Sequence, residues 1–187
     1  MIRELRRTTL LTVAVVAATA VACTDPFEPI LTPIPEPREA ELIDFEQGDL
    51  VDAAAYDMLT SSAVRTDQTS GWDFLFVVDD EEGPALLPRS GLLDDDSSAG
   101  VQLADGPFDT LESAPEDGYS TSDLVPVAPG DVLLLVSRQN PGVSVRCRVY
   151  GKLEVESIEG SPAVLALRVV INPNCERRRL IEEEDED

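Results

Sequence analysis

Nearly perfect alternation of apolar and polar side chains over Val143–Ser157 is the feature that most constrains the fold of this chain. Alternation with a period of two is typical of a half-buried antiparallel strand. Glu159–Pro162 predicts a turn, and Ala163–Ile171 returns with Leu165, Leu167, Val169 and Ile171 at one parity. The pattern therefore predicts a C-terminal hairpin, with Tyr150 and Lys152 on its polar face.

The hairpin register brings two cysteines together. If Gly160–Pro162 is a three-residue loop, Glu159 faces Ala163, and residue 147 then faces residue 175. Both positions are cysteines of the apolar parity, so we predict a Cys147–Cys175 disulfide. In the chain-entropy model such a bridge contributes about 3–4 kcal/mol, and it requires an oxidising compartment. The alternative is a pair of free buried thiols.

Other segments predict further strands of a single all-β domain, a sandwich of two packed antiparallel sheets over residues 41–180. Trp72–Asp79 is rich in aromatic and branched residues, with Trp72, Phe74 and Phe76 at one parity, and its two apolar faces predict a central strand. Residues 84–123 are interpreted as mostly loop. The remaining strand candidates are residues 41–45, 61–66, 101–104 and 131–138, while residues 53–59 fit either a short helix or a bent strand.

The N-terminus has the pattern of a secretory signal over residues 1–22. Three arginines within residues 1–9 precede an uncharged apolar run, Leu10–Ala22. This run is shorter than the roughly 20 residues that a membrane-spanning helix needs. A basic start, a short apolar run and small residues before a cleavage site are typical of exported proteins.

Ala20–Cys23 resembles the lipoprotein box of bacteria, which ends in a small residue and a cysteine. The resemblance implies that Cys23 is acylated and becomes the mature N-terminus, so that a lipid anchor makes the membrane a partner. Thr24 follows the cysteine, which in such lipoproteins implies the outer membrane. The alternatives are an ordinary cleaved signal with a free Cys23 and an uncleaved anchor.

A proline-rich tether and an acidic tail flank the predicted domain. Residues 24–40 contain five prolines, which favour an extended conformation of about 3.1 Å per residue. Residues 23–40 are therefore interpreted as a lipidated tether. The chain ends in six acidic residues, so residues 181–187 are predicted to be disordered.

Charge and composition exclude several functional classes. The chain has 14 basic and 37 acidic residues, a formal charge of −23, and no histidine. So negative a charge argues against nucleic acid as a partner, because nucleic-acid affinity depends on Lys and Arg. The absence of histidine excludes Ser-His-Asp triads and histidine metal or haem ligands. We therefore expect a non-enzymatic protein without a cofactor.

Few residues stand out as site candidates. Asp94, Asp95 and Asp96 could supply oxygens to a calcium ion, as could the acidic run Asp79–Glu82, although neither has the spacing of a known calcium loop. Trp72 is a candidate ligand contact, and so is Tyr119 as the best exposed aromatic residue. A further alternative to a binding site is a pair of carboxylates that acts as the catalytic pair of a hydrolase.

Two strand motifs, Trp72–Phe76 and Tyr150–Leu153, lie within residues 60–171. Together with the signal, they resemble the HmuY-like haem-binding lipoproteins, an all-β exported family. The resemblance implies two packed sheets, but a bis-histidine haem site is impossible in a chain without histidine. The predicted function is that of a membrane-anchored binding or interaction module for a protein or small-molecule partner. The alternatives are a divergent small-ligand or cation scavenger and a carboxylate-dependent hydrolase.

Overall fold

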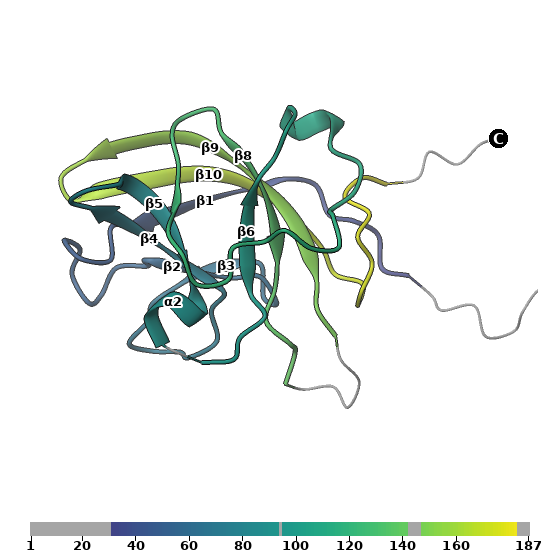
Figure 1. Ribbon diagram of the computed structural model, residues 1–187, viewed down its shortest axis with the longest axis horizontal. Helices are drawn as coiled ribbons and strands as arrows, with labels where there is room; N and C mark the ends of the chain where they lie inside the picture. The colour runs from purple at the N-terminus through teal and green to yellow at the C-terminus, as the bar shows by residue number, and fades with distance from the viewer. Residues whose placement is uncertain (1–30, 94, 142–146, 183–187) are drawn as a thin grey trace, which may run out of the picture. The chain divides into compact units, whose positions relative to one another are not determined.

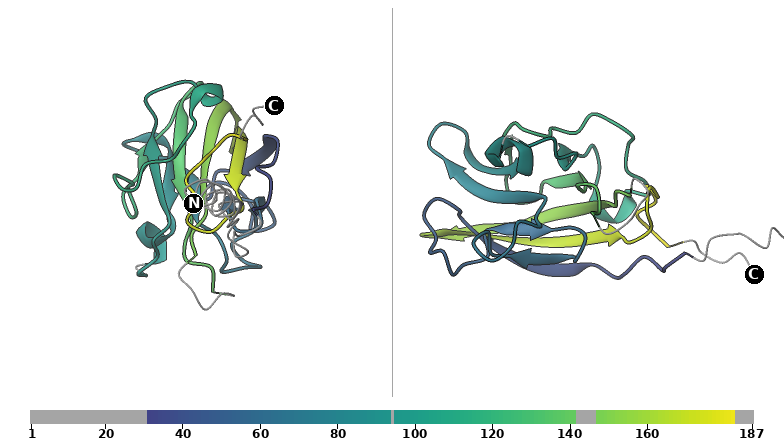
Figure 2. Two further views of the ribbon diagram at one scale, coloured as in Figure 1. Left: turned by 90° about the vertical axis from the view of Figure 1, so that its right-hand side faces the viewer. Right: turned by 90° about the horizontal axis from the view of Figure 1, so that it is seen from below.

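Ten strands form two antiparallel sheets in the part of the chain that the structure describes (Figure 1). The structure is a computed structural model, and it describes residues 31–93, 95–141 and 147–182. The two sheets pack together as layers (Figure 2). The predicted all-β, two-sheet sandwich is therefore confirmed.

Each sheet has five strands. Sheet A has the order β1 (Arg38–Ile43), β10 (Ala163–Asn172), β9 (Tyr150–Gly160), β8 (Val132–Val136) and β6 (Gly100–Leu103). Sheet B has the order β3 (Ser62–Val64), β2 (Ala55–Asp57), β4 (Phe74–Asp79), β5 (Gly83–Pro88) and β7 (Val125–Pro126). Two short helices, α2 (Arg89–Leu93) and η2 (Phe108–Thr110), lie in the connections.

The main core lies between the sheets, because alternate side chains of each strand point inward. Its members are buried apolar residues of both sheets, including Leu42, Tyr56, Met58, Phe74, Phe76, Leu86, Leu133, Leu135, Leu153, Val155, Leu165 and Leu167. Apolar burial of this extent supplies most of the driving force for folding.

The β9–β10 hairpin confirms the predicted pairing but not its turn. Gly160 faces Ala163, so the loop has two residues instead of the predicted three. Gly160 has a φ of +92°, which glycine adopts without steric cost. A register shift beside Ala166 leaves Glu156 unpaired, and Val155 then faces Leu167 as the predicted register requires. This bulge cancels the error in loop length.

The Cys147–Cys175 disulfide is present, with its Cα atoms 4.9 Å apart. The strand β9 begins only at Tyr150, later than the predicted Val143. Residues 142–146 lie outside the described residues. The disulfide therefore joins the segments just before β9 and just after β10.

The strand β4 is central in sheet B, as predicted, between β2 and β5. The predicted face for Trp72 is wrong. Trp72 packs with Leu75 and Val77 on the outer side, because the strand begins at Phe74 and alternation does not extend back to residue 72.

Two other expectations differ from the structure. The strand β5 pairs with β4 over six residues inside the region interpreted as loop. Its prolines, Pro84 and Pro88, stand near its ends, where proline is tolerated in a strand but also suggests a turn. The ordered unit also begins before the predicted Glu41, because β1 starts at Arg38 and Asn174 holds Thr32 through two hydrogen bonds. Within the described residues, no helix is long and apolar enough to cross a bilayer.

Candidate functional site

A pocket of about 520 Å³ opens on the outer face of sheet A. Its volume falls in the range of about 300–1,000 Å³ that is typical of small-molecule sites. Four segments contribute to it: β6 with the residues after it, the segment after η2, β8, and the chain that follows the disulfide. The lining residues are Gln102, Leu103, Ala104, Asp105, Ser113, Ala114, Pro115, Leu134 and Arg178.

The floor of the pocket is apolar. Leu134 of β8 points outward, because its neighbours Leu133 and Leu135 point into the main core. It packs with Ala114, Tyr150 and other residues in a small outer cluster. The floor therefore offers an apolar surface to a ligand and belongs to the sheet, not to the loops around it.

One wall of the pocket is held in place by Lys152, the only lysine of the chain. Its Nζ donates hydrogen bonds to the carbonyl oxygens of Phe108 (2.8 Å) and Leu111 (3.0 Å) and lies 4.7 Å from the Phe108 ring centroid. Burial lowers the pKa of Lys152, Asp109 opposes this shift, and Arg168 adds to it. The segment around η2 is thus fastened across β9. Tyr150 and Lys152, which the alternation places on the polar face of the hairpin, are both buried.

The neighbouring segment of the pocket carries Arg178. The Ala114 N–H donates to the carbonyl oxygen of Arg178 (2.8 Å), and the Leu180 N–H donates to that of Glu112 (2.7 Å). Leu180 is buried in the outer cluster. The Cys147–Cys175 disulfide lies three residues before Arg178. The backbone that carries this guanidinium is therefore fixed on both sides.

Polar side chains around the pocket have few partners. Arg178 Nη1 lies 3.8 Å from Glu116, whose side chain is 84% exposed. Oε1 of Gln102 is buried without a hydrogen-bond donor. Within the described residues, no side-chain hydrogen bond or ion pair engages Asp105 or Ser113. The guanidinium of Arg178 is a cationic hydrogen-bond donor, so the pocket can hold an anionic group beside hydrogen-bonding side chains.

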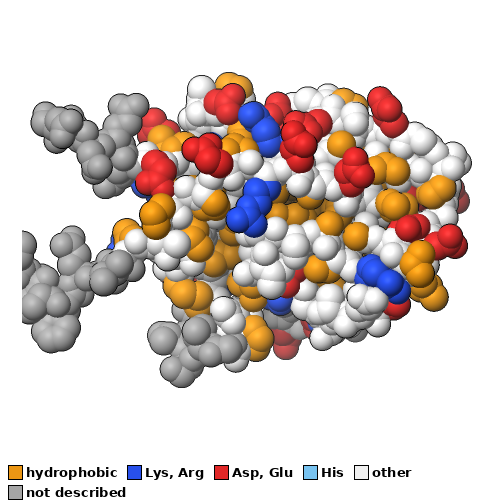
Figure 3. Space-filling model, turned by 180° about the vertical axis from the view of Figure 1, so that it is seen from behind, with side chains coloured by type: hydrophobic (Ala, Val, Ile, Leu, Met, Phe, Trp, Pro, Cys, Tyr) orange, Lys and Arg blue, Asp and Glu red, His pale blue; other side chains and the backbone are white. Residues whose placement is uncertain are grey.

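Basic side chains are scarce on this acidic protein. Figure 3 shows one face, on which acidic side chains are numerous and basic side chains stand singly among them. Arg178 lines a pocket and is paired only at long range with an exposed glutamate. On so acidic a protein, such an arginine is a better indication of a ligand site than another acidic residue is.

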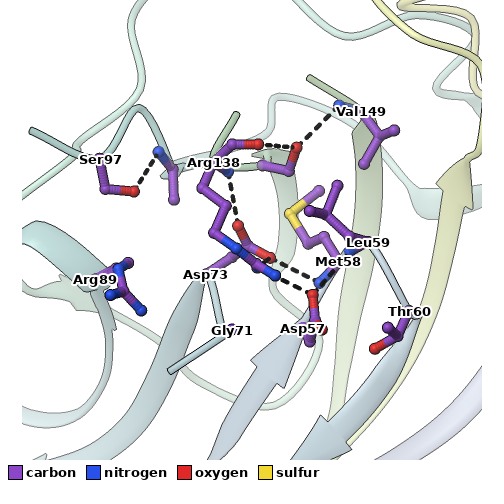
Figure 4. Close-up of polar contacts among 12 residues, drawn as sticks. Asp57, Met58, Leu59, Thr60, Gly71, Asp73, Arg89, Ser97, Arg138 and Val149 are labelled. Atoms are coloured by element: carbon purple, nitrogen blue, oxygen red, sulfur yellow. Dashed lines mark hydrogen bonds and ion pairs between the residues drawn. The ribbon is translucent and has the colours of Figure 1, made fainter. Parts of the chain in front are cut away.

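A second polar cluster is buried between the sheets (Figure 4). Asp73 accepts hydrogen bonds from the backbone N–H of Arg138 (2.7 Å), from Arg138 Nη1 (2.8 Å) and from the backbone N–H of Met58 (2.7 Å). Arg138 Nη1 also lies 3.0 Å from Asp57. Burial raises the pKa of Asp73, while Arg138 and the two N–H groups oppose that shift. Because its donors and acceptors engage each other, this cluster joins the sheets and offers little to a ligand.

The predicted aromatic candidates do not line the pocket. Trp72 is 2% exposed, and the Arg89 guanidinium lies 5.2 Å from its ring centroid. Tyr119 is half-buried, not exposed, and its hydroxyl donates to the carbonyl oxygen of Pro115. Burial raises the pKa of Tyr119. Trp72 and Tyr119 therefore serve packing, although Tyr119 supports a segment of the pocket wall.

The predicted acidic candidates also lie elsewhere. Asp95 receives Arg89 Nε at 2.7 Å. Burial works against ionisation of Asp95, but hydrogen bonds from Arg89, Ser97 and Ser90 hold its pKa below the ordinary value. Asp96 is exposed, and Asp94 and Cys23 lie outside the described residues. Among the residues that the structure describes, no three acidic or cysteine side chains are grouped to hold a metal.

A pocket of about 540 Å³ on the outer face of sheet B contains part of the acidic run Asp79–Glu82. Asp79 and Glu82 line it together with Glu46 and Asp123, above the apolar side chains of Val77, Leu87 and Leu124. Hydrogen bonds from the N–H groups of Glu82 and Glu81 lower the pKa of Asp79. Acidic side chains of this kind are common on a chain so rich in carboxylates.

Arg178, Asp105, Gln102 and Ser113 are absent from the candidates that the sequence suggests. In the sequence, Arg178 is one of three consecutive arginines that are interpreted as a solvated charge run. The one available signal is its position three residues after the predicted disulfide, which implies that its backbone is held against the hairpin. Asp105 and Ser113 belong to a loop whose path the sequence pattern does not predict.

Comparisons with known proteins identify no family for this chain. No family model matches the chain, and searches of the curated proteins and of the solved structures found no match.

Proposed function

We propose that this protein is an exported, lipid-anchored and non-enzymatic binding protein, and that its pocket holds a small molecule with an anionic group. The ligand's anionic group lies against Arg178, and its apolar part lies on Leu134. The observation that carries the proposal is a guanidinium with one distant and exposed partner, above a buried apolar floor in the same pocket.

Export is supported by two independent features. The first is the signal pattern of residues 1–22, which ends at the lipoprotein-like Cys23. The second is the Cys147–Cys175 disulfide, because disulfides persist in exported proteins and are rare in the cytosol. A binding protein on a lipid anchor would collect its ligand at the surface of a membrane.

The test is thermal unfolding of the mature protein, purified in detergent, with a panel of small apolar carboxylates. A ligand at one hundred times its dissociation constant stabilises the folded state by about 2.7 kcal/mol. We expect a shift for at least one carboxylate and its loss in Arg178→Gln.

Arg177→Gln is the matched control, because Arg177 is exposed and does not line the pocket. A panel without any shift, or an equal loss in Arg177→Gln and Arg178→Gln, would contradict the proposed function.

A further inference from the structure

We infer that the pocket on sheet A recognises a zwitterion, namely an apolar amino acid or dipeptide with a free ammonium group and a free carboxylate. The carboxylate pairs with Arg178 and the ammonium group with Asp105. This inference rests on the proposed function and names the class of ligand.

The first argument is that opposite charges line one pocket without pairing. Arg178 and Asp105 are both lining residues. Arg178 lies within 4.0 Å of Glu116 alone, and Asp105 forms no ion pair with any basic side chain of the described residues. A ligand that carries both charges satisfies the two side chains at once. A ligand with a single charge leaves one of them facing a neutral or like-charged group.

A neutral polar side chain of the pocket fits the same ligand. Oε1 of Gln102 lacks a donor but is closed off from solvent, so it is not offered to the ligand. An ammonium group brings three N–H donors, so it can donate to Asp105. The hydroxyl of Ser113 has no partner among the described residues and can donate to the carboxylate beside Arg178.

The apolar floor selects the rest of the ligand. Leu134 and Ala114 are 7% and 3% exposed, and Ala104 packs beside them. An aliphatic side chain buried on this floor loses contact with water, which favours binding. Glycine has no side chain to bury on this floor, so it gains no binding free energy from apolar contact there.

The charges also argue against other ligand classes. A divalent metal ion needs several oxygen ligands and would be repelled by Arg178. A phosphate carries up to two negative charges and would be repelled by Asp105. The presence of one positive and one negative side chain in the pocket therefore favours a ligand that is neutral overall but charged at both ends.

The experiment is isothermal titration of the mature protein in detergent with L-leucine, N-acetyl-L-leucine and L-leucinamide. We expect L-leucine to bind and each blocked derivative to bind about tenfold more weakly or worse, because each lacks one charged contact. Arg178→Gln should weaken L-leucine binding by a similar factor. Asp105→Asn should also weaken it and should abolish the discrimination against N-acetyl-L-leucine.

Arg177→Gln and Asp117→Asn are the matched controls, because their side chains are exposed like those of Arg178 and Asp105 but do not line the pocket. Equal binding of L-leucine and N-acetyl-L-leucine overturns the zwitterion while an Arg178-dependent carboxylate site stands. Stronger binding of L-leucinamide than of L-leucine overturns both the zwitterion and the carboxylate site, because L-leucinamide has no carboxylate to pair with Arg178. If no carboxylate binds, both the inference and the proposed function fail.

Discussion

At the scale of single residues, Asp73 and Arg138 decide how the two sheets are joined. Asp73 comes just before β4 of sheet B, and Arg138 comes just after β8 of sheet A. Three hydrogen bonds converge on the Asp73 carboxylate, which is 1% exposed. A buried carboxylate is tolerated when its partners compensate for lost hydration, and breaking such a pair leaves a charge without a partner.

Asp73→Asn is therefore expected to lower the free energy of unfolding by about 3–5 kcal/mol. The amide replaces one acceptor with a donor that faces existing donors. The measurement is urea denaturation of the mature protein. Asp67→Asn is the control, because the Arg65–Asp67 pair is at the surface and its loss should cost about 0–1 kcal/mol. Equal losses in the two variants would show that Asp73 has no special role.

Tyr56 gives a pH prediction at the same scale. Burial raises its pKa from 10.0 to about 12, Arg38 opposes the shift, and Asp57 adds to it. The folded state therefore keeps this phenol proton longer than the unfolded state does. Its contribution to stability is complete below pH 10 and is lost between pH 10 and 12, by about 2–3 kcal/mol.

The measurement is ultraviolet titration of the folded protein together with urea denaturation at several alkaline pH values. Tyr56→Phe should lose the phenolate transition near pH 12 and show a weaker fall in stability. A Tyr56 transition near pH 10 in the folded protein would contradict the assignment.

At the scale of elements, the segment around η2 is the part that turns a plain sheet face into a pocket. Lys152 fastens it by hydrogen bonds to two of its carbonyl oxygens, and Phe108 packs on Val132 and Val170. The alternation of β9 predicted Lys152 at the exposed parity, and the parity is correct. Its burial comes from a segment more than forty residues away in sequence, which no local pattern reports.

Because Lys152 is the only lysine, an amine-reactive reagent reports the opening of this segment. We expect Lys152 in the folded protein to be modified far more slowly than in urea, as measured by peptide mass spectrometry. Phe108→Ala should speed the modification, because the segment loses its apolar contact with the sheet. Asp117→Asn, at an exposed position, should leave the rate unchanged. Rapid modification of Lys152 in the folded wild-type protein would contradict its burial under the segment around η2.

At the scale of the whole molecule, the proposed anchor and the sandwich have separate functions. The sandwich holds the pocket, and the acylated Cys23 would keep it at a membrane. An acidic protein with a formal charge of −23 gains no attraction from anionic lipid, so a covalent lipid is a physically reasonable means of attachment.

Replacement of the anchor residue tests this arrangement. Cys23→Ser, expressed in a bacterium that processes lipoproteins, is expected to leave the membrane fraction, because two or more acyl chains are needed for stable attachment. Mass spectrometry should find an acylated N-terminal peptide in the wild type only. The Cys147→Ser and Cys175→Ser pair controls for loss of a thiol elsewhere and should stay with the membrane. A wild-type protein without acyl groups would favour an ordinary cleaved signal.

The sequence by itself determined the all-β class, the central position of β4 and the Cys147–Cys175 disulfide. These follow from period-two alternation and hairpin register, which are local properties of the chain. The tertiary structure alone decided the burial of Lys152, the strand β5 and the pocket that brings Arg178 and Asp105 together. Each of these depends on where a distant or turn-like segment crosses a sheet, and side-chain packing over long sequence separations sets that path.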